Sequence, residues 1–128
     1  MSPKGSTSSE VEMLGRRILE SHPDIAWVTV LDENGETLFH GQGRGHPPMA
    51  KIGKETRARL GFIDAVFLKA FTQGEKWYGK MDFVVLAFRT TKVMLMRDRR
   101  RNLYLAMRMP RSGNATYLHH RIEAVLNE

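Results

Sequence analysis

The chain has 128 residues and a mass of 14.7 kDa, the size of one domain. It contains no cysteine, which excludes a disulfide framework, thiol catalysis and cysteine-ligated metal centres. Twenty Lys and Arg against 14 Asp and Glu give a net charge of +6, which favours an acidic partner or simply solubility.

The chain opens with a predicted tail and a predicted helix. Residues 1–9 are small and polar, which is typical of a disordered tail, and residues 10–128 are expected to form a single domain. A helix is predicted over Glu10–Ser21, capped by Ser8 or Ser9. Its apolar residues recur at helical spacing and share one side: Val11, Leu14, Ile18 and Leu19.

A β-hairpin is the clearest local prediction. Ile25–Leu31 is rich in β-branched and aromatic residues, and Glu36–His40 is the returning strand. The turn between them contains Asn34-Gly35, a dipeptide typical of tight hairpin turns. Residues 41–48 hold three glycines and two prolines and are predicted to form a loop without regular structure.

The middle of the chain predicts one long helix over Met49–Phe71, or two helices that meet near Gly61. Its second half is apolar over much of its circumference, so we expect it to be buried on more than one side. A second subunit could supply the second cover. Alternatively, one broad apolar stripe packs on a sheet.

Three strands and a final helix follow Gln73-Gly74. The predicted strands are Lys80–Arg89, Lys92–Met96 and Asn102–Met109, with turns at residues 90–91 and 98–101, and the predicted helix is Ala115–Asn127. Methionines at period two in the last two strands are expected in the core: Met94, Met96, Met107 and Met109.

The order of these elements is α-β-β-α-β-β-β-α, which predicts an α+β fold with a five-stranded antiparallel sheet packed with helices. With this order, the Asp32-x-Asn34-Gly35 turn and the doubly apolar middle helix, the chain resembles the roadblock/dynein-light-chain fold and its longin and profilin-like relatives over residues 10–127. It also resembles a group of small archaeal proteins that has no assigned activity. That similarity lies in Ile18-Leu19, Val28–Gly41, Gly43-Arg44-Gly45 and the final helix around His120.

The resemblance implies a homodimer formed through the middle helix and the strand after it, which joins two sheets into one. By position it assigns six apolar residues to the dimer interface: Phe62, Val66, Phe67, Phe71, Phe83 and Val85. Roadblock-type dimers usually act as non-catalytic scaffolds, often for small GTPases or larger complexes. The resemblance therefore implies a binding module rather than an enzyme.

Two groups of cations form a candidate site for an anion or nucleic acid. One group is Arg97, Arg99, Arg100 and Arg101 in a turn, and the other is Lys51, Lys54 and Arg57 at three-residue spacing, with Arg44 just before them. The planar guanidinium binds two phosphate or carboxylate oxygens at once, and Tyr104 and Trp77-Tyr78 could offer stacking surfaces. Nucleic acid, an acidic protein and a solvated turn that protects a sheet edge all remain open as explanations.

No motif predicts a catalytic site, a metal site or a cofactor. The run Gly41-x-Gly43-x-Gly45 lacks the strand–turn–helix context of a nucleotide fingerprint, and the histidines contain no metal-binding helical pair. A minor alternative is an enzyme centred on Asp32, His40 and His46. We expect a cytoplasmic protein without a membrane partner, because residues 1–10 lack the apolar core of a signal and no stretch approaches about 18 apolar residues.

Overall fold

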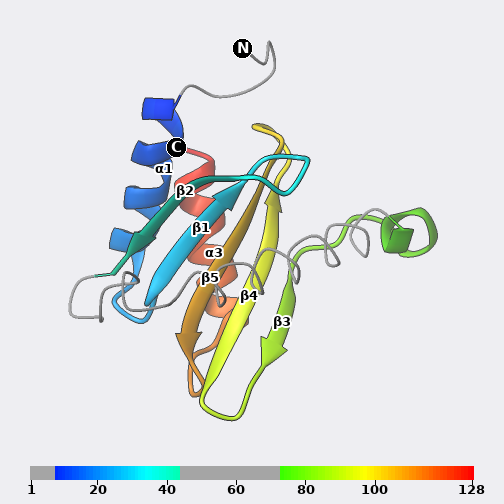
Figure 1. Ribbon diagram of the computed structural model, residues 1–128. Helices are drawn as coiled ribbons and strands as arrows, with labels where there is room; N and C mark the ends of the chain where they lie inside the picture. Colours follow the sequence, from blue (N-terminus) through cyan, green and yellow to red (C-terminus); the bar gives the residue numbers. More distant parts are fainter. Residues whose placement is uncertain (1–7, 44–72) are drawn as a thin grey trace.

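A five-stranded antiparallel sheet forms the centre of the structure, in the order β2-β1-β5-β4-β3 (Figure 1). The computed structural model describes residues 8–43 and 73–128. The strands are β1 (Trp27–Leu31), β2 (Thr37–Gln42), β3 (Val84–Ala87), β4 (Thr91–Asp98) and β5 (Leu103–Pro110). The sheet confirms the predicted α+β class, and the β1–β5 pair joins the first hairpin to the three later strands.

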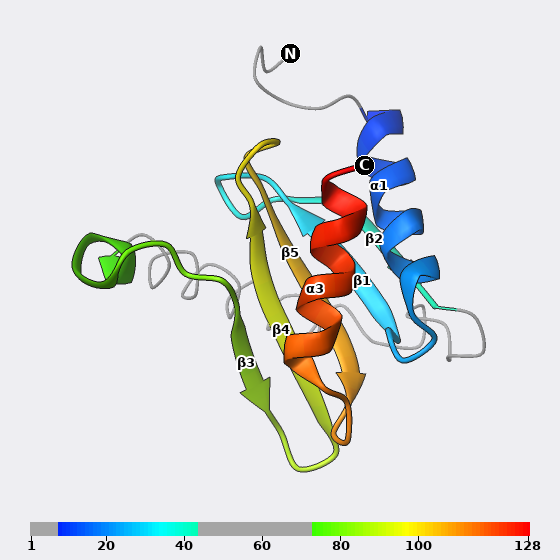
Figure 2. The ribbon, with the colours of Figure 1, turned by 180° about the vertical axis from the view of Figure 1, so that it is seen from behind.

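Two helices cover one face of this sheet. The helices α1 (Ser8–Ser21) and α3 (Ala115–Leu126) lie side by side on that face (Figure 2). The Asn114 side chain accepts the backbone N–H of Tyr117 and caps α3. The main core fills the space between helices and sheet, and the four methionines predicted to lie there are at most 1% exposed: Met94, Met96, Met107 and Met109.

The opposite face of the sheet carries a second, smaller apolar cluster. Its buried members are Ala26, Trp27, Leu31, Val93, Leu95, Tyr104 and Ala106. Residues 83–86, which comprise Phe83 and the first three residues of β3, are half-buried and alternate between the two faces. Phe83 and Val85 pack against the main core, and Val84 and Leu86 pack against the second cluster. Both faces of the sheet are therefore apolar.

The first hairpin differs from its prediction in two places. Gly41 and Gln42, predicted to lie in a loop, belong to β2. A Cβ atom on Gly41 would lie 2.7 Å from the Phe39 ring and 3.0 Å from Leu19 Cδ1, so this glycine serves the packing of α1 on β2 rather than a loop.

The turn of this hairpin is longer than an Asn-Gly pair. It spans residues 32–36, and Asp32 Oδ1 accepts the backbone N–H groups of Asn34 and Glu36 at 2.8 and 2.9 Å. The carboxylate of Asp32 thus organises the turn, as short polar side chains do in Asx turns.

The chain before β3 also departs from its prediction. Residues 73–78 are helical, although the sequence predicts a break at Gln73-Gly74. This 73–78 helix ends at Gly79, which has φ 85° and donates its N–H to the Glu75 carbonyl, as in a left-handed helix cap. Consequently β3 begins at Val84 rather than at Lys80.

Other boundaries agree within about two residues, the usual spread at element ends. The helix α1 begins at Ser8 instead of Glu10, so Ser8 and Ser9 are helical rather than capping residues. The predicted middle helix, Met49–Phe71, lies outside the described residues.

Candidate functional site at the arginine turn

The last two residues of β4 and the connection to β5, together residues 97–102, are here called the arginine turn. Asp98 and Asn102 shape its backbone. Asp98 is 3% exposed, and its Oδ1 accepts the backbone N–H of Arg101 at 3.3 Å. Asn102 has φ 56°, a left-handed conformation that asparagine tolerates better than most residues, and returns the chain into β5.

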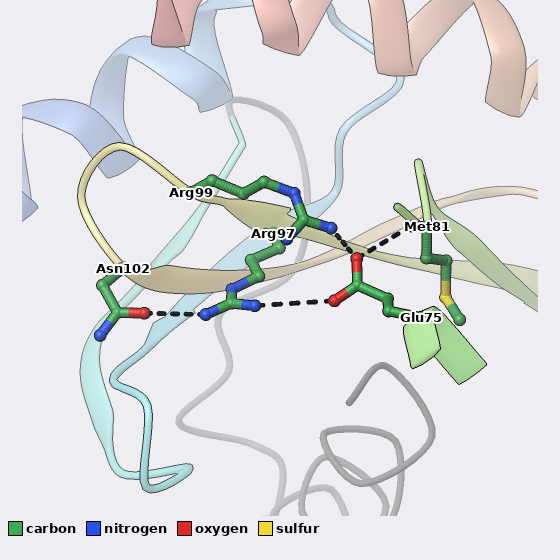
Figure 3. A network of polar contacts seen from close by, with 5 residues as sticks. All are labelled: Glu75, Met81, Arg97, Arg99 and Asn102. Atoms are coloured by element: carbon green, nitrogen blue, oxygen red, sulfur yellow. Dashed lines mark hydrogen bonds and ion pairs between the residues drawn. The ribbon is translucent and has the colours of Figure 1, made fainter. Parts of the chain in front are cut away.

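Glu75 of the 73–78 helix forms ion pairs with two arginines of this turn (Figure 3). Arg97 Nη1 lies 3.7 Å from Glu75 Oε1, and Arg99 Nη2 pairs with Oε2. The same Oε2 accepts the backbone N–H of Met81 at 3.0 Å. One carboxylate therefore ties the helix end, the segment leading to β3 and the arginine turn together.

Further contacts fix Arg97 and Asn102. Arg97 Nη2 donates to Asn102 Oδ1 at 3.0 Å, and its guanidinium lies 5.2 Å from the Tyr104 ring centroid. Asn102 Nδ2 in turn donates to Glu33 Oε2 at 2.8 Å. The arginine turn is thereby linked to the turn of the first hairpin.

The two remaining arginines of the turn meet the C-terminal end of α3. Arg100 Nη2 and Arg101 Nη1 donate to the Leu126 carbonyl at 3.1 and 3.0 Å. Cations here complement the exposed carbonyls and the negative end of the helix dipole. Arg101 also pairs with Asp98 at 2.8 Å. Three of the four predicted anion-binding arginines therefore already hold a carboxylate, and the fourth holds a helix end.

A hollow of about 280 Å³ lies beside the arginine turn. Its cationic lining comes from Lys80, Arg97, Arg99 and Arg100, and Arg97 Nε is buried without a hydrogen-bond partner within the described residues. Its acidic lining comes from Asp82, Asp98 and Glu123. The hollow is thus strongly polar, with more cations than carboxylates.

Two aromatic side chains stand in solvent next to this network. Trp77 is 82% exposed and Tyr78 is 91% exposed. The 73–78 helix that carries them lies outside the β3 edge of the sheet in both views (Figures 1 and 2). By contrast, Trp27 is 6% exposed, as its place in a predicted strand indicated.

The predicted interface residues are only partly described, and the second basic group lies wholly outside the described residues. Phe83 and Val85 are half-buried against the main core, and the Phe83 ring lies 4.9 Å from the His119 ring. The other predicted residues of both sets lie outside the described residues: Phe62, Val66, Phe67, Phe71, Arg44, Lys51, Lys54 and Arg57.

The sequence offered Asp32, His40 and His46 as the centre of a possible enzyme, and the first two make contacts within the first hairpin. Asp32 holds its own turn, and His40 Nδ1 lies 2.7 Å from Thr29 Oγ1 on β1, with its ring 5.6 Å from the Trp27 ring. His46 lies outside the described residues. Over residues 8–43 and 73–128, no group of three His, Asp or Glu side chains could hold a metal ion.

Over residues 8–43 and 73–128, no helix has the length and apolar character of a membrane span.

Glu75 was not found by sequence reasoning, and the sequence offered Trp77-Tyr78 as a stacking surface without showing its exposure. Glu75 is one acid in a mixed segment, and its partner Arg99 is 24 residues away. No local spacing connects the two. The adjacent aromatics at 77–78 were visible in the sequence, but their exposure depends on where the helix lies.

Comparisons with known proteins support the fold. No family model matches the chain, and no curated protein matches its sequence. Among solved structures, MglB of Myxococcus xanthus has a TM-score of 0.69 at 10% identity, over 99% of this chain and 90% of that one. A gliding protein MglB of Thermus thermophilus has a TM-score of 0.63 at 8% identity, over 98% and 87%.

A third similar structure carries the family description itself. The Roadblock/LC7 domain from Streptomyces avermitilis has a TM-score of 0.62 at 14% identity, over 91% of each chain. Another MglB structure is described with a tetrameric arrangement. The narrower resemblance to the archaeal group stays a prediction. The described sheet and helices, together with these similarities, show that this chain has the roadblock fold.

Proposed function

We propose that this chain is a non-catalytic, homodimeric binding module of roadblock type, in which two copies join through the outer edge of β3. The observation that carries the proposal is the chemistry of that edge. The strand β3 is the last in the sheet, and its sequence Val84–Ala87 contains no charge and no proline. Natural sheets usually protect an exposed edge strand with charged residues or proline. An edge strand that lacks both favours pairing with another strand.

The register indicates which backbone groups of β3 point outward. Phe88 N donates to Thr91 O at 2.8 Å, so these two residues form a hydrogen-bonded pair at the turn. Hydrogen-bonded and non-bonded pairs alternate along an antiparallel ladder. Leu86 therefore bonds to β4, whereas Val85 and Ala87 direct their N–H and C=O groups away from it. These are the groups that a second β3 would meet.

The surrounding side chains are suited to an interface. Residues 83–86 are half-buried, and Phe88 is 46% exposed. A second copy on this edge would cover apolar surface on both faces of the sheet, which is the main favourable contribution to association. Phe83 and Val85, predicted as interface residues, would flank the joint between the two sheets.

The other edge of the sheet is less suited to pairing. A register shift between Val30 and Leu31 interrupts the ladder of β2, and bulges of this kind discourage edge-to-edge contact. In addition, α1 packs so closely on β2 that a Cβ atom on Gly15 would lie 2.3 Å from the Phe39 ring. The outer edge of β3 is therefore the better interface.

The proposed partners follow from charge and from the resemblance. Residues 73–111 hold ten Lys and Arg and three Asp and Glu, a net charge of +7. An acidic protein surface would complement this half of the molecule. The roadblock resemblance further implies a small GTPase or a larger complex as the partner that such a dimer would carry. The contacts of Asp32 and His40 within the hairpin support a non-catalytic role.

Proline at Ala87 tests the dimer. Ala87 is exposed, so Ala87→Pro removes an outward N–H with little loss of core packing. We expect the wild-type chain to elute at about twice 14.7 kDa in light scattering coupled to size exclusion, and the variant to elute as a monomer. Ala87→Val, which keeps the N–H, is the control and should stay dimeric. A monomeric wild type, or a dimeric proline variant with unchanged circular dichroism, would contradict the proposal.

A further inference from the structure

We propose that Trp77 and Tyr78, here called the aromatic platform, bind single-stranded nucleic acid together with the cations beside them. This function goes beyond the dimeric scaffold and does not depend on it. The ligand class combines planar bases, which stack on exposed rings, with a phosphate backbone, which pairs with cations.

The exposure of the platform is the first observation. Trp77 is 82% and Tyr78 is 91% exposed, whereas the other tryptophan, Trp27, is 6% exposed. Large aromatic side chains are on average among the well-buried residues, because each buries about 150–250 Å² when covered. Two such rings adjacent in solvent indicate a surface that another molecule covers.

The second observation is that the platform is held in place. Gly79 ends the 73–78 helix directly after Tyr78, with φ 85°. Glu75, two residues before Trp77, binds Arg97, Arg99 and the backbone N–H of Met81 (Figure 3). Contacts on both sides of the rings therefore fix the helix end. A preorganised surface loses less conformational entropy when a ligand binds.

The third observation is the charge around the platform. Lys76 and Lys80 lie next to the rings in the chain and are exposed, as are Arg99 and Arg100. Lys80, Arg99 and Arg100 also line the hollow of about 280 Å³ beside the arginine turn. Residues 73–111 carry a net charge of +7, whereas residues 8–43, with two arginines and seven acids, carry −5. The platform thus lies in the basic half of the molecule.

Together these features favour a single strand over other anionic partners. In a duplex the bases are stacked on each other and cannot reach a protein ring, whereas unpaired bases can. The carboxylates of an acidic protein would pair with the cations, but they would not stack on the two rings. A single strand uses both the rings and the cations within one chain.

The test is a titration of the full chain at low salt with oligothymidylate of roughly 20 nucleotides, longer than a typical single-strand site. The readout is tryptophan emission, because only one of the two tryptophans is exposed. We expect strong quenching of the wild type, and loss of the quenching in Trp77→Phe with binding retained by fluorescence anisotropy. The affinity should fall with salt, by a log–log slope of about 0.7 for each phosphate contacted.

Variants separate the platform from general charge attraction. Replacing both Trp77 and Tyr78 by Ala should weaken binding about 10-fold to 100-fold, since stacking on each ring contributes to affinity. The control is Tyr117→Ala, which removes a tyrosine that is 50% exposed on α3, outside the basic half. It should leave the affinity unchanged.

Three results would overturn the proposal. The first is no quenching and no binding of the oligonucleotide at low salt. The second is poly-L-glutamate binding as tightly as the oligonucleotide and equally reduced by the alanine variants, which would assign the surface to an acidic protein. The third is a blue shift of Trp77 emission that grows with protein concentration and is unaffected by the oligonucleotide. That result would assign the platform to contact with a second copy.

Discussion

At the scale of single residues, Glu75 connects the 73–78 helix to the arginine turn and to the segment before β3. Its side chain is 17% exposed, forms ion pairs with two guanidiniums and accepts one backbone N–H. Without it, Arg97 and Arg99 would keep their partly buried charges without a carboxylate. The cost of leaving such groups unpaired usually exceeds the benefit of an average surface ion pair.

Replacing Glu75 by Gln should therefore destabilise the protein. The variant keeps the size of the side chain and an acceptor for Met81 N–H but removes the charge. We expect the free energy of unfolding in urea to fall by about 1–2 kcal/mol. Glu12→Gln is the control, because the Glu12–Arg16 pair is 55% and 64% exposed and should contribute less than about 0.5 kcal/mol. Equal losses in the two variants would contradict this role of Glu75.

The partners of individual charged residues were the feature that the sequence predicted least well. The four arginines of the turn were visible as a cluster, and the cluster predicted an anion site. Their partners are Glu75, Asp98 and the Leu126 carbonyl, and the last is 26 residues from Arg100. A charge pattern shows that cations are close in the chain, but it does not show which acids or helix ends the fold brings to them.

At the scale of elements, the packing of α1 on β2 depends on two close approaches. A Cβ atom on Gly15 would lie 2.3 Å from Phe39 Cδ2 and Cε2, and one on Gly41 would lie 2.7 Å from the same ring. The ring of Phe39 thus lies where side chains at both positions would otherwise be. The helix can approach the strand this closely only because neither position has a side chain.

Gly15→Ala tests this packing because two effects oppose each other. In an exposed helix the change would stabilise by about 1 kcal/mol. Here we expect a loss of about 1–3 kcal/mol in urea unfolding, because the added methyl overlaps the Phe39 ring. Adding Phe39→Leu to the variant should recover part of that loss. A stabilising Gly15→Ala substitution would show that α1 does not approach β2 this closely.

Elements with a regular period were predicted well from the sequence. The β4 and β5 strands and α3 follow from alternating or helical apolar spacing, and each agrees within two residues. The assignment of residues 41–42 to a loop was wrong, since glycine marks a close approach as well as a loop. The strand order did not follow from local periodicity, because it depends on pairing between strands far apart in the sequence, such as β1 and β5. The 73–78 helix was not predicted either, and its Glu75 contacts residues that are distant in the sequence.

At the scale of the whole molecule, charge is distributed along the sheet. The acidic residues 8–43 form α1, β1 and β2 at one side, and the basic residues 73–111 include β3, β4 and β5 at the other. The net charge of +6 follows from the composition alone. The separation of acidic and basic residues to opposite sides of the sheet becomes visible only once the strand order is known. A dimer through β3 would place two basic halves side by side. Like charges repel, so an anionic ligand bound across the joint would favour that dimer.

The most direct test of the dimer is amide hydrogen exchange of Val85 and Ala87, followed by NMR over a range of protein concentrations. The N–H groups of these residues point away from β4, so in a monomer they should exchange rapidly with solvent. We predict that their protection rises with concentration, while that of Leu86, which already bonds to β4, changes little. Rapid exchange of Val85 and Ala87 at every concentration, in a chain that is nevertheless dimeric, would contradict an interface at β3.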